Sequence, residues 1–567
     1  MEKVFRHVRD TSLFLPILFA YLVLILIVSP VGDFPLNDDW VYAKTVQSFL
    51  DTGTYAGHPF TDALFVLQAF WGYLWTSVFG FSFTVLRFST IACAILGAWG
   101  IALAARHCGL SRGVALVAAG LFLSNPIILN LTYTFMTDVP FLSLTALSMA
   151  SYLKFFSDPA RPIKWVLIGS ILAALSCLIR QFGIFTGAAF VAVLALDSLQ
   201  RKERPNLSVL VAWLAPWLVV YGGTTFLPDT GAGLAMAWDW DYLGWSLFNR
   251  ISNGTKHFFT VMLYQAYFLL PLVPLFFISG WRNRDRNFWK ILVGAGAAFL
   301  FCIWMLEIHL GTRIPLIGNM LYDFGVGPLL FSGMRDEEGL VRSSVRIGGV
   351  WGIITLLTAA AAACALVYFV RYFSSFKDFF SKAKAFDFDR RELFLLTLSL
   401  LFVMGLFNPG LDVIYDRYFV AASIPFIVLA LMKLSSHPIR YMSVATVLWL
   451  TISAFQVHDY MSWNRARWEA IEILHNEMNI EPEIVNGGYE YNGWFTSDPF
   501  FYDKVSTDRR IYGTKGWWVV DDDYAMSMVQ LPNYEVERTI PYSSWFGLSK
   551  GEILIQRRVA EDENPFI

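Results

Sequence analysis

Charged residues are scarce in this sequence. Asp, Glu, Lys and Arg make up 16% of the 567 residues, hydrophobic residues make up 56%, and the mean hydropathy is +0.50. A soluble globular protein carries about 25% charged residues, so this composition excludes an ordinary soluble protein. The formal net charge is −2, and no basic patch points to nucleic acid as a partner.

Cysteine is also rare, and histidine does not cluster. This distribution excludes a disulfide framework or a CxxC metal site and indicates inert core thiols. We therefore expect neither a metal ion nor another cofactor. The five cysteines lie in or beside apolar runs, and none lies in the polar C-terminal segment: Cys93, Cys108, Cys177, Cys302 and Cys364.

Long apolar runs fill most of the chain. They are about 20 residues long, which is the length needed to cross a hydrocarbon core roughly 30 Å thick. The runs are continuously apolar and not alternating, which favours helices over a membrane barrel. We expect thirteen spanning helices, at 12–30, 84–104, 113–130, 138–156, 165–179, 182–198, 207–227, 258–280, 290–306, 348–370, 392–407, 417–433 and 441–456. The fifth and sixth are short and could form a hairpin that does not fully cross.

The first run follows three basic residues, Lys3, Arg6 and Arg9, in the manner of a signal peptide. However, the run is long, contains Pro16 and lacks a small-x-small cleavage site at its end. We expect a retained first helix with its N-terminus in the cytoplasm.

The segment 62–80 is apolar enough to span, but it is rich in aromatic residues, which favour the membrane–water interface. If it lies flat, the loops that contain "RKER" (201–204), "RNRDR" (282–286) and "DRRE" (389–392) share the side of the N-terminus. The positive-inside rule requires that arrangement, and a spanning segment would reverse it. We therefore predict that 62–80 lies on the outer surface, beside a second interfacial helix at 39–51.

The chain becomes polar and acidic from His458 onward. "NRARWEAIEILHNEM" (464–478) has helical spacing, and "EIVNGG" (483–488) and "GEILIQRRV" (551–559) have the composition of strands. The predicted fold is a polytopic α-helical membrane domain at 1–456 followed by a small α/β domain at 457–567. After thirteen crossings, the second domain lies outside the cytoplasm.

Ionisable residues gather at the predicted outer ends of the helices. Ionisable groups at membrane depth are rare and indicate function by default, so we predict a cavity that opens outward at the bilayer boundary. The candidates are Asp38, Asp39, Asp138, Arg180 and Arg417, with Tyr42, and, in the outer loop 307–347, Arg313 together with Glu307, His309, Asp323 and Arg335.

Each candidate also has a structural reading. Asp38 or Asp39 could cap the helix that follows, because Asp is a favoured N-cap. Asp138, two residues before Pro140, is a plausible cap as well. Arg417 could be an interfacial arginine whose head reaches water. Arg180 is flanked by apolar sequence, so its charge needs a partner.

Three short motifs, in this order and on one predicted side, carry a resemblance. They are "DD" at 38–39 in the first outer loop, "TDVP" at 137–140 and "DRYFVAASIP" at 416–425. Together with the two interfacial helices, they resemble the GT-C glycosyltransferases, more narrowly glycosyltransferase family 39. That family includes protein O-mannosyltransferases and the lipid A aminoarabinose transferase, whose thirteen helices and periplasmic C-terminal domain the layout resembles. Many relatives carry Asp-Glu at the first motif.

The resemblance implies an enzyme that moves a sugar from a polyprenyl phosphate to a hydroxyl of a lipid, glycan or protein. It implies a bacterial inner membrane protein that acts on the periplasmic face in the cell envelope, and direct displacement would invert the anomeric centre. Asp38 would be the general base, and Asp39 would orient Asp38 or the acceptor. Asp138 would bind acceptor or sugar, and Arg180 and Arg417 would hold the departing phosphate.

Two other classes of protein stay open. A transporter or flippase would place charges and broken helices near the bilayer midplane, often in inverted repeats, and the sequence suggests neither. A non-catalytic component of envelope assembly would fit the acidic, aromatic C-terminal segment. The sugar, the acceptor and the polyprenol are not determined by the sequence.

Overall fold

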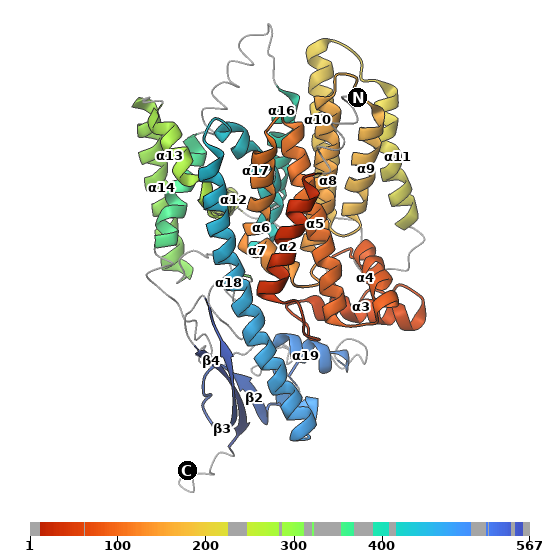
Figure 1. Cartoon of the computed structure of the whole chain (residues 1–567), viewed down its shortest axis with the longest axis vertical. Coiled ribbons are helices and arrows are strands. Elements are labelled where there is room, and N and C mark those ends of the chain that lie inside the picture. The colour runs from red at the N-terminus through yellow and green to blue at the C-terminus, as the bar shows by residue number, and fades with distance from the viewer. Residues whose placement is uncertain are drawn as a thin grey trace.

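The computed structural model describes residues 12–61, 63–224, 246–282, 286–310, 320–321, 353–367, 389–406, 415–499, 518–519, 521–545 and 550–559. Helices run along the long axis of the molecule, and a small sheet lies beyond one end of the helical bundle (Figure 1). The helices are α2 (Phe14–Val28), α3 (Asp39–Thr52), α4 (Val66–Phe79), α5 (Phe83–His107), α6 (Arg112–Ser124), α7 (Pro126–Thr132), α8 (Asp138–Ser157), α9 (Ile163–Cys177), α10 (Ile184–Arg201), α11 (Leu207–Thr224), α12 (Leu247–Phe268), α13 (Val273–Arg282), α14 (Arg286–Leu310), α16 (Arg390–Leu406), α17 (Val420–Leu434), α18 (Ile439–Glu472) and α19 (Tyr489–Phe495).

Each of the thirteen predicted spans contains a described helix; the segment 348–370 contains the helix Ile353–Val367. Five helices among the described residues are long and apolar enough to cross a membrane, or up to seven if each bent pair is one span, by length and composition alone. The predicted fold class, a polytopic α-helical membrane protein, is confirmed. In the predicted hairpin, α9 is the short arm with 15 residues. The other arm, Gln181–Arg201, is by itself long and apolar enough to cross a membrane.

Two helices are broken, which the sequence analysis did not predict. α6 and α7 meet at an angle of 72°, and the helices on either side of Leu269 meet at 66°. At the first break, the side chain of Asn125 accepts hydrogen bonds from the backbone N–H groups of Ile127 and Ile128, and Pro126 begins α7. The Asn-Pro dipeptide was the available signal, since it favours a turn.

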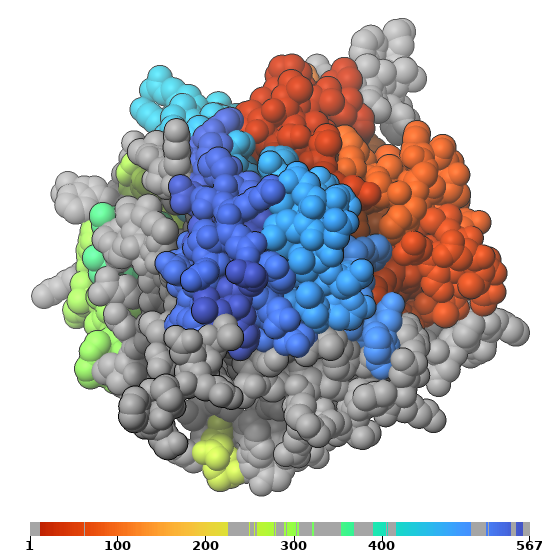
Figure 2. Space-filling view, turned by 90° about the horizontal axis from the view of Figure 1, so that it is seen from below, coloured from red at the N-terminus to blue at the C-terminus, as the bar shows by residue number. Residues whose placement is uncertain are grey.

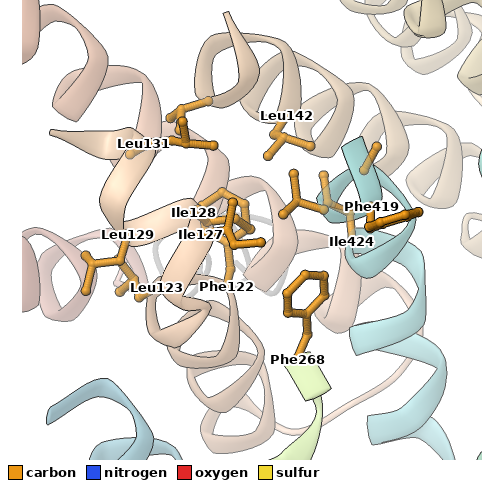
Figure 3. Packing of buried hydrophobic residues seen from close by; sticks show 14 of the residues in the cluster. Phe122, Leu123, Ile127, Ile128, Leu129, Leu131, Leu142, Phe268, Phe419 and Ile424 are labelled. Carbon is orange, nitrogen blue, oxygen red and sulfur yellow. The ribbon is translucent and has the colours of Figure 1, made fainter. Parts of the chain in front are cut away.

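Hydrocarbon side chains fill the space around this break. Figure 3 shows residues of α6 and α7 packed against α8, the end of α12 and α17, with Ile127 and Ile128 at the centre of the cluster. Both side chains are fully buried. The break is therefore stabilised by apolar packing and one polar cap. The loop 133–137, which leads from α7 into α8, follows directly after it.

α3 and α4 lie together at the end of the bundle nearest the sheet (Figure 1). α4 has 14 residues, which is about 21 Å at 1.5 Å per residue and too short for a hydrocarbon core of roughly 30 Å. The rings of Phe49 in α3 and Tyr73 in α4 stack with centroids 4.5 Å apart. The length alone does not separate α4 from α2 and α9, which have 15 residues each, but the pairing of α4 with α3 at this end of the bundle agrees with two interfacial helices.

The C-terminal residues form a four-stranded sheet in the order β1-β2-β4-β3. The strands are β1 (Val485–Asn486), β2 (Tyr524–Ser527), β3 (Tyr534–Ser543) and β4 (Lys550–Arg558); β1 is parallel to β2, and the other pairs are antiparallel. β1 and β4 confirm the predicted strands, and the helix expected at 464–478 continues α18 and ends in a π-turn, Ile473–Glu477. α18 is 34 residues long and passes the expected domain boundary at 456–457 without a break.

Candidate active site

Asp38 lies in the turn between α2 and α3, at the N-cap position of α3. Its side chain makes no capping hydrogen bond. Instead, Oδ2 lies 3.0 Å from Nη2 of Arg417, and Oδ1 accepts a hydrogen bond of 2.7 Å from the hydroxyl of Tyr489. The Asp38 side chain is 23% exposed and that of Arg417 is 6% exposed. The carboxylate is therefore held in place from two sides and still accessible from a third, which a simple helix cap would not require.

Asp39 has a different environment. The residue is fully buried, and its side chain accepts hydrogen bonds from the backbone N–H groups of Leu36 and Phe135. Burial raises the pKa of the Asp39 carboxyl, although Arg87 and the two N–H donors act in the opposite direction. Asp39 thus ties the turn that carries Asp38 to the loop that precedes α8.

Asp138 begins α8 and pairs with Arg180. Nη2 of Arg180 lies 3.1 Å from Oδ2 of Asp138, and its Nε donates a hydrogen bond of 2.8 Å to Oγ1 of Thr137. Arg180 lies between α9 and the 3-10 turn η1 (Gln181–Gly183), where an extended residue separates the two helices of the hairpin. The sequence required a partner for this arginine, and Asp138 is that partner.

Arg417 lies in the 3-10 turn η4 (Asp416–Phe419), just before α17. Its guanidinium lies 5.0 Å from the ring centroid of Tyr415, and its Nε is buried without a hydrogen-bond partner among the described residues. The neighbouring Asp416 accepts hydrogen bonds from the backbone N–H groups of Met320 and Leu321. The turn is therefore fixed by Asp416, while the Arg417 guanidinium retains an unused donor.

The two ion pairs converge on two tyrosines. The guanidinium carbons of Arg180 and Arg417 lie 5.4 Å and 5.8 Å from the ring centroid of Tyr418. Burial is the main cause of a raised pKa at Tyr42 in α3, and the charges of both ion pairs act on its hydroxyl. Five of the predicted residues thus lie around one position, at the ends of α3, α8, α10 and α17: Asp38, Asp138, Arg180, Arg417 and Tyr42.

The predictions for Arg313 and for the absence of a metal ion stay untested. Arg313 lies outside the described residues, as do most residues of its loop. Within the parts of the chain that the structure describes, no three His, Cys, Asp or Glu side chains gather in a group that could hold a metal ion.

Tyr418 and Tyr489 also belong to the site, and neither was among the predicted residues. Tyr418 stands directly beside Arg417, but nothing in the spacing distinguished it from an ordinary core aromatic residue. Tyr489 lies 451 positions from Asp38 in the chain, and no local pattern connects residues at that separation. The motif "GGYEYNGW" (487–494) contains the relevant tyrosine, but only the folded chain shows which tyrosine faces Asp38.

Residues 66–221 match the sequence profile of the family described as dolichyl-phosphate-mannose-protein mannosyltransferase. The matched segment runs from α4 to α11, covers less than half of the chain, and contains Asp138 and Arg180. The match confirms the predicted resemblance and, with the helical fold, the prediction of an integral membrane glycosyltransferase. No curated protein matches the chain.

Two solved structures are similar to the chain. One is ArnT from Cupriavidus metallidurans bound to undecaprenyl phosphate, with 12% identity, a TM-score of 0.41, and 96% of this chain and 98% of that chain covered. The other is the archaeal oligosaccharyltransferase AglB from Archaeoglobus fulgidus, in complex with an inhibitory peptide and a dolichol-phosphate. Its identity is 14%, its TM-score is 0.39, and 92% of this chain and 70% of that chain are covered. Both TM-scores are low, so the fold assignment rests on the helices and sheet described above.

Proposed function

We propose that this protein transfers a sugar from a polyprenyl-phosphate donor to an acceptor hydroxyl, with inversion at the anomeric carbon. The observation that carries the proposal is the convergence of Asp38–Arg417 and Asp138–Arg180 on Tyr418 and Tyr42. Two carboxylates and two guanidiniums in one place supply both functions that the reaction needs, a proton acceptor and donors for a departing phosphate. The family that matches residues 66–221 is described by a dolichyl-phosphate sugar donor.

Asp38 is the general base in this proposal. The acceptor O–H gives its proton to the carboxylate while the acceptor oxygen bonds to the anomeric carbon, and the bond from that carbon to the phosphate oxygen breaks. The electron pair of the broken bond leaves with the phosphate. Asp38 suits the role because it is partly exposed, whereas Asp39 is fully buried and occupied by backbone donors. Asp39 orients the base by holding its turn.

Arg417 and Arg180 hold the phosphate. A guanidinium presents up to five N–H donors in a plane that suits phosphate oxygens. Nε of Arg417 has no partner among the described residues, so it can bind a phosphate oxygen without loss of an existing hydrogen bond. Asp138 binds the sugar or the acceptor, and Tyr42, whose hydroxyl lies within the field of both ion pairs, contributes to substrate binding. Arg313 is proposed as a further donor.

The proposed location is a bacterial inner membrane, with the N-terminus in the cytoplasm and the C-terminal domain in the periplasm. The loop arginines support it, because positive residues concentrate on the predicted cytoplasmic side. A reporter enzyme active only in the periplasm, fused after Ile567, should be active. An inactive fusion beside an active cytoplasmic reporter at the same position would reverse the orientation.

The reaction is tested with full-length protein in lipid nanodiscs. Mass spectrometry of lipids that co-purify identifies candidate donors, and undecaprenyl phosphates that carry a hexose, an N-acetylhexosamine or an aminopentose form the test panel. We expect release of undecaprenyl phosphate from one donor by the wild type and strongly reduced release by Asp38→Asn. Equal release by both proteins would exclude Asp38 as the base.

The rival function is movement of a lipid-linked sugar across the membrane. The two broken helices favour it, because transporters use interrupted helices at their binding sites. The site residues instead lie at helix ends, next to α3 and α4. Movement of an unaltered donor between leaflets of a vesicle, without release of undecaprenyl phosphate, would support this rival.

A further inference from the structure

The C-terminal part of the chain contributes a side chain to the proposed active site. The short helix α19 places Tyr489 against the turn before α3, and its hydroxyl donates a hydrogen bond of 2.7 Å to Oδ1 of Asp38. Since Oδ2 of the same carboxylate faces Nη2 of Arg417 at 3.0 Å, both oxygens are held by residues from distant parts of the sequence. Figure 2 shows the C-terminal residues in blue directly beside the red and orange surface of the N-terminal segments.

The ring of Tyr489 is enclosed by tryptophans. Its centroid lies 6.2 Å from that of Trp40 and 5.5 Å from that of Trp518, and both indoles are almost completely buried. Gly493, one turn further along α19, lies flat against Trp40, where a Cβ atom would come within 2.4 Å of the indole. This packing holds the Tyr489 ring in place between the two indoles.

The residues next to this hydrogen bond are also joined. The backbone N–H of Asn37 donates a hydrogen bond of 3.0 Å to Oε1 of Glu490, whose Oε2 lies 2.8 Å from Nη1 of the buried Arg467. Asn37 precedes Asp38 and Glu490 follows Tyr489. Two adjacent contacts therefore set the position of α19 relative to the turn that carries Asp38. Asn37 has a positive φ of 56°, a conformation that asparagine tolerates well.

Tyr489 stays a hydrogen-bond donor at neutral pH. Its hydroxyl is buried and faces the Asp38 carboxylate, and both factors raise the pKa of Tyr489 well above its usual value. The hydroxyl therefore holds the Asp38 carboxylate through the hydrogen bond that it donates.

We propose that Tyr489 is a positioning residue for the general base: the C-terminal segment fixes the Asp38 carboxylate so that its remaining lone pairs face the acceptor hydroxyl. This inference rests on the proposed function and adds that the C-terminal segment is part of the transfer machinery. It follows that loss of the Tyr489 hydroxyl affects catalysis through Asp38.

The test compares two tyrosines of the same helix. Tyr489→Phe keeps the ring between the tryptophans and removes only the hydroxyl, and we expect kcat to fall about 10-fold or more, with the donor KM changed less than twofold, because a hydrogen bond to a charged group is lost. Tyr491→Phe is the matched control, since Tyr491 is fully buried and its hydroxyl contacts Nε2 of His475 at 2.8 Å. Tyr491→Phe should lower the melting temperature about as much as Tyr489→Phe does, and it should leave kcat unchanged. A Tyr489→Phe variant with the wild-type kcat would overturn the inference.

A double variant separates positioning from a general structural effect. If Tyr489 acts through Asp38, Tyr489→Phe should cause no further loss in an Asp38→Asn background, and an additional 10-fold loss there would overturn the inference. The same cycle, measured by melting temperature, should show coupling between the two residues even without a donor. Additive changes in melting temperature would also contradict the inference. If Asp38→Asn keeps the full rate, the proposed role of Asp38 fails, and the inference fails with it. If Asp38→Asn is inactive and Tyr489→Phe keeps the wild-type kcat, only the inference about Tyr489 fails.

Discussion

The two ends of the helical bundle use ion pairs in different ways. α8 and α10 each have one end at the candidate site, near Asp138 and Arg180, and the other end near Asp197. There, a single carboxylate faces three arginines, Arg161, Arg201 and Arg390, whose side chains are 27–44% exposed. At the candidate site, each carboxylate pairs with one arginine, and those arginines are only 6–12% exposed.

This difference indicates different roles. Excess positive charge near water is what the positive-inside rule describes. Although the Asp197 side chain is only 4% exposed, its arginine partners reach water, and pairs with exposed partners contribute little to stability. Buried charges in balanced pairs are costly to desolvate, so their retention beside tyrosines and at the ends of four helices suggests a requirement of function. Substitutions at the two ends should therefore differ in their effect on the rate of transfer.

The largest effect is expected for Asp38→Asn. Asn is as good an N-cap as Asp, so α3 should remain stable, but the amide cannot accept the proton. A general base contributes about 10²–10⁴-fold in rate, and the release of undecaprenyl phosphate should fall by that factor. Asp51→Asn, at an exposed position in the last turn of α3, should leave the rate unchanged.

The outcome at Asp39 refines this prediction. Asp39→Asn should reduce the rate less than Asp38→Asn does, since an amide oxygen can still accept one of the two backbone hydrogen bonds. If Asp39→Asn alone abolishes transfer, the order of roles within the acidic pair is reversed.

A large loss of stability is expected for Glu490→Gln. Glu490 and Arg467 form a pair that is 3% and 1% exposed, and removal of one charge from a buried pair costs about 3–5 kcal/mol. The melting temperature in detergent should fall markedly. Glu537→Gln is the control, because Glu537 pairs with Arg557 at the surface of the sheet and such pairs contribute about 0–1 kcal/mol. Equal melting temperatures for the two variants would show that the Arg467–Glu490 pair does not hold α19 in place.

A moderate effect is expected for Arg417→Lys and Arg180→Lys. Lysine keeps the positive charge but loses the planar set of donors, so kcat/KM for the donor should fall about 10–100-fold, while the alanine variants lose more. Binding of undecaprenyl phosphate alone, measured by native mass spectrometry, should weaken in parallel. Arg440→Ala, at an exposed position, should bind it like wild type. If both alanine variants use the donor like wild type, these arginines are interfacial residues without a role in the reaction.

The smallest effect is expected for Asp197→Asn. The Asp197 side chain is only 4% exposed, but its three partners reach water. Each pair with such an exposed partner contributes about 0.2–1 kcal/mol, so the melting temperature should fall by only a few degrees. The rate of transfer should stay within about twofold of wild type, because Asp197 lies at the other end of α10. A loss of rate as large as that of Asp38→Asn would show that the two ends do not differ in function.

The sequence by itself determined the membrane class and the positions of the helices. Continuous apolar runs of about 20 residues have few alternatives to a helix in a bilayer, so all thirteen segments contain a described helix. The pairing of α4 with α3 agrees with the interfacial placement that the loop charges predicted. Asp38, Asp138, Arg180 and Arg417 were recognised because ionisable residues are rare in such a chain.

Only the tertiary structure decided how these residues are paired. The salt bridges Asp38–Arg417 and Asp138–Arg180 join positions 379 and 42 residues apart, and the Tyr489–Asp38 hydrogen bond joins positions 451 apart. Periodicity and capping rules act over a few residues, so they give each side chain a place on its own helix and no partner on another. The partners, the burial of Asp39 and the exposure of Asp38 arise when α3, α8, η4 and α19 pack at one end of the bundle, because only then does each charge lose water and require a specific neighbour.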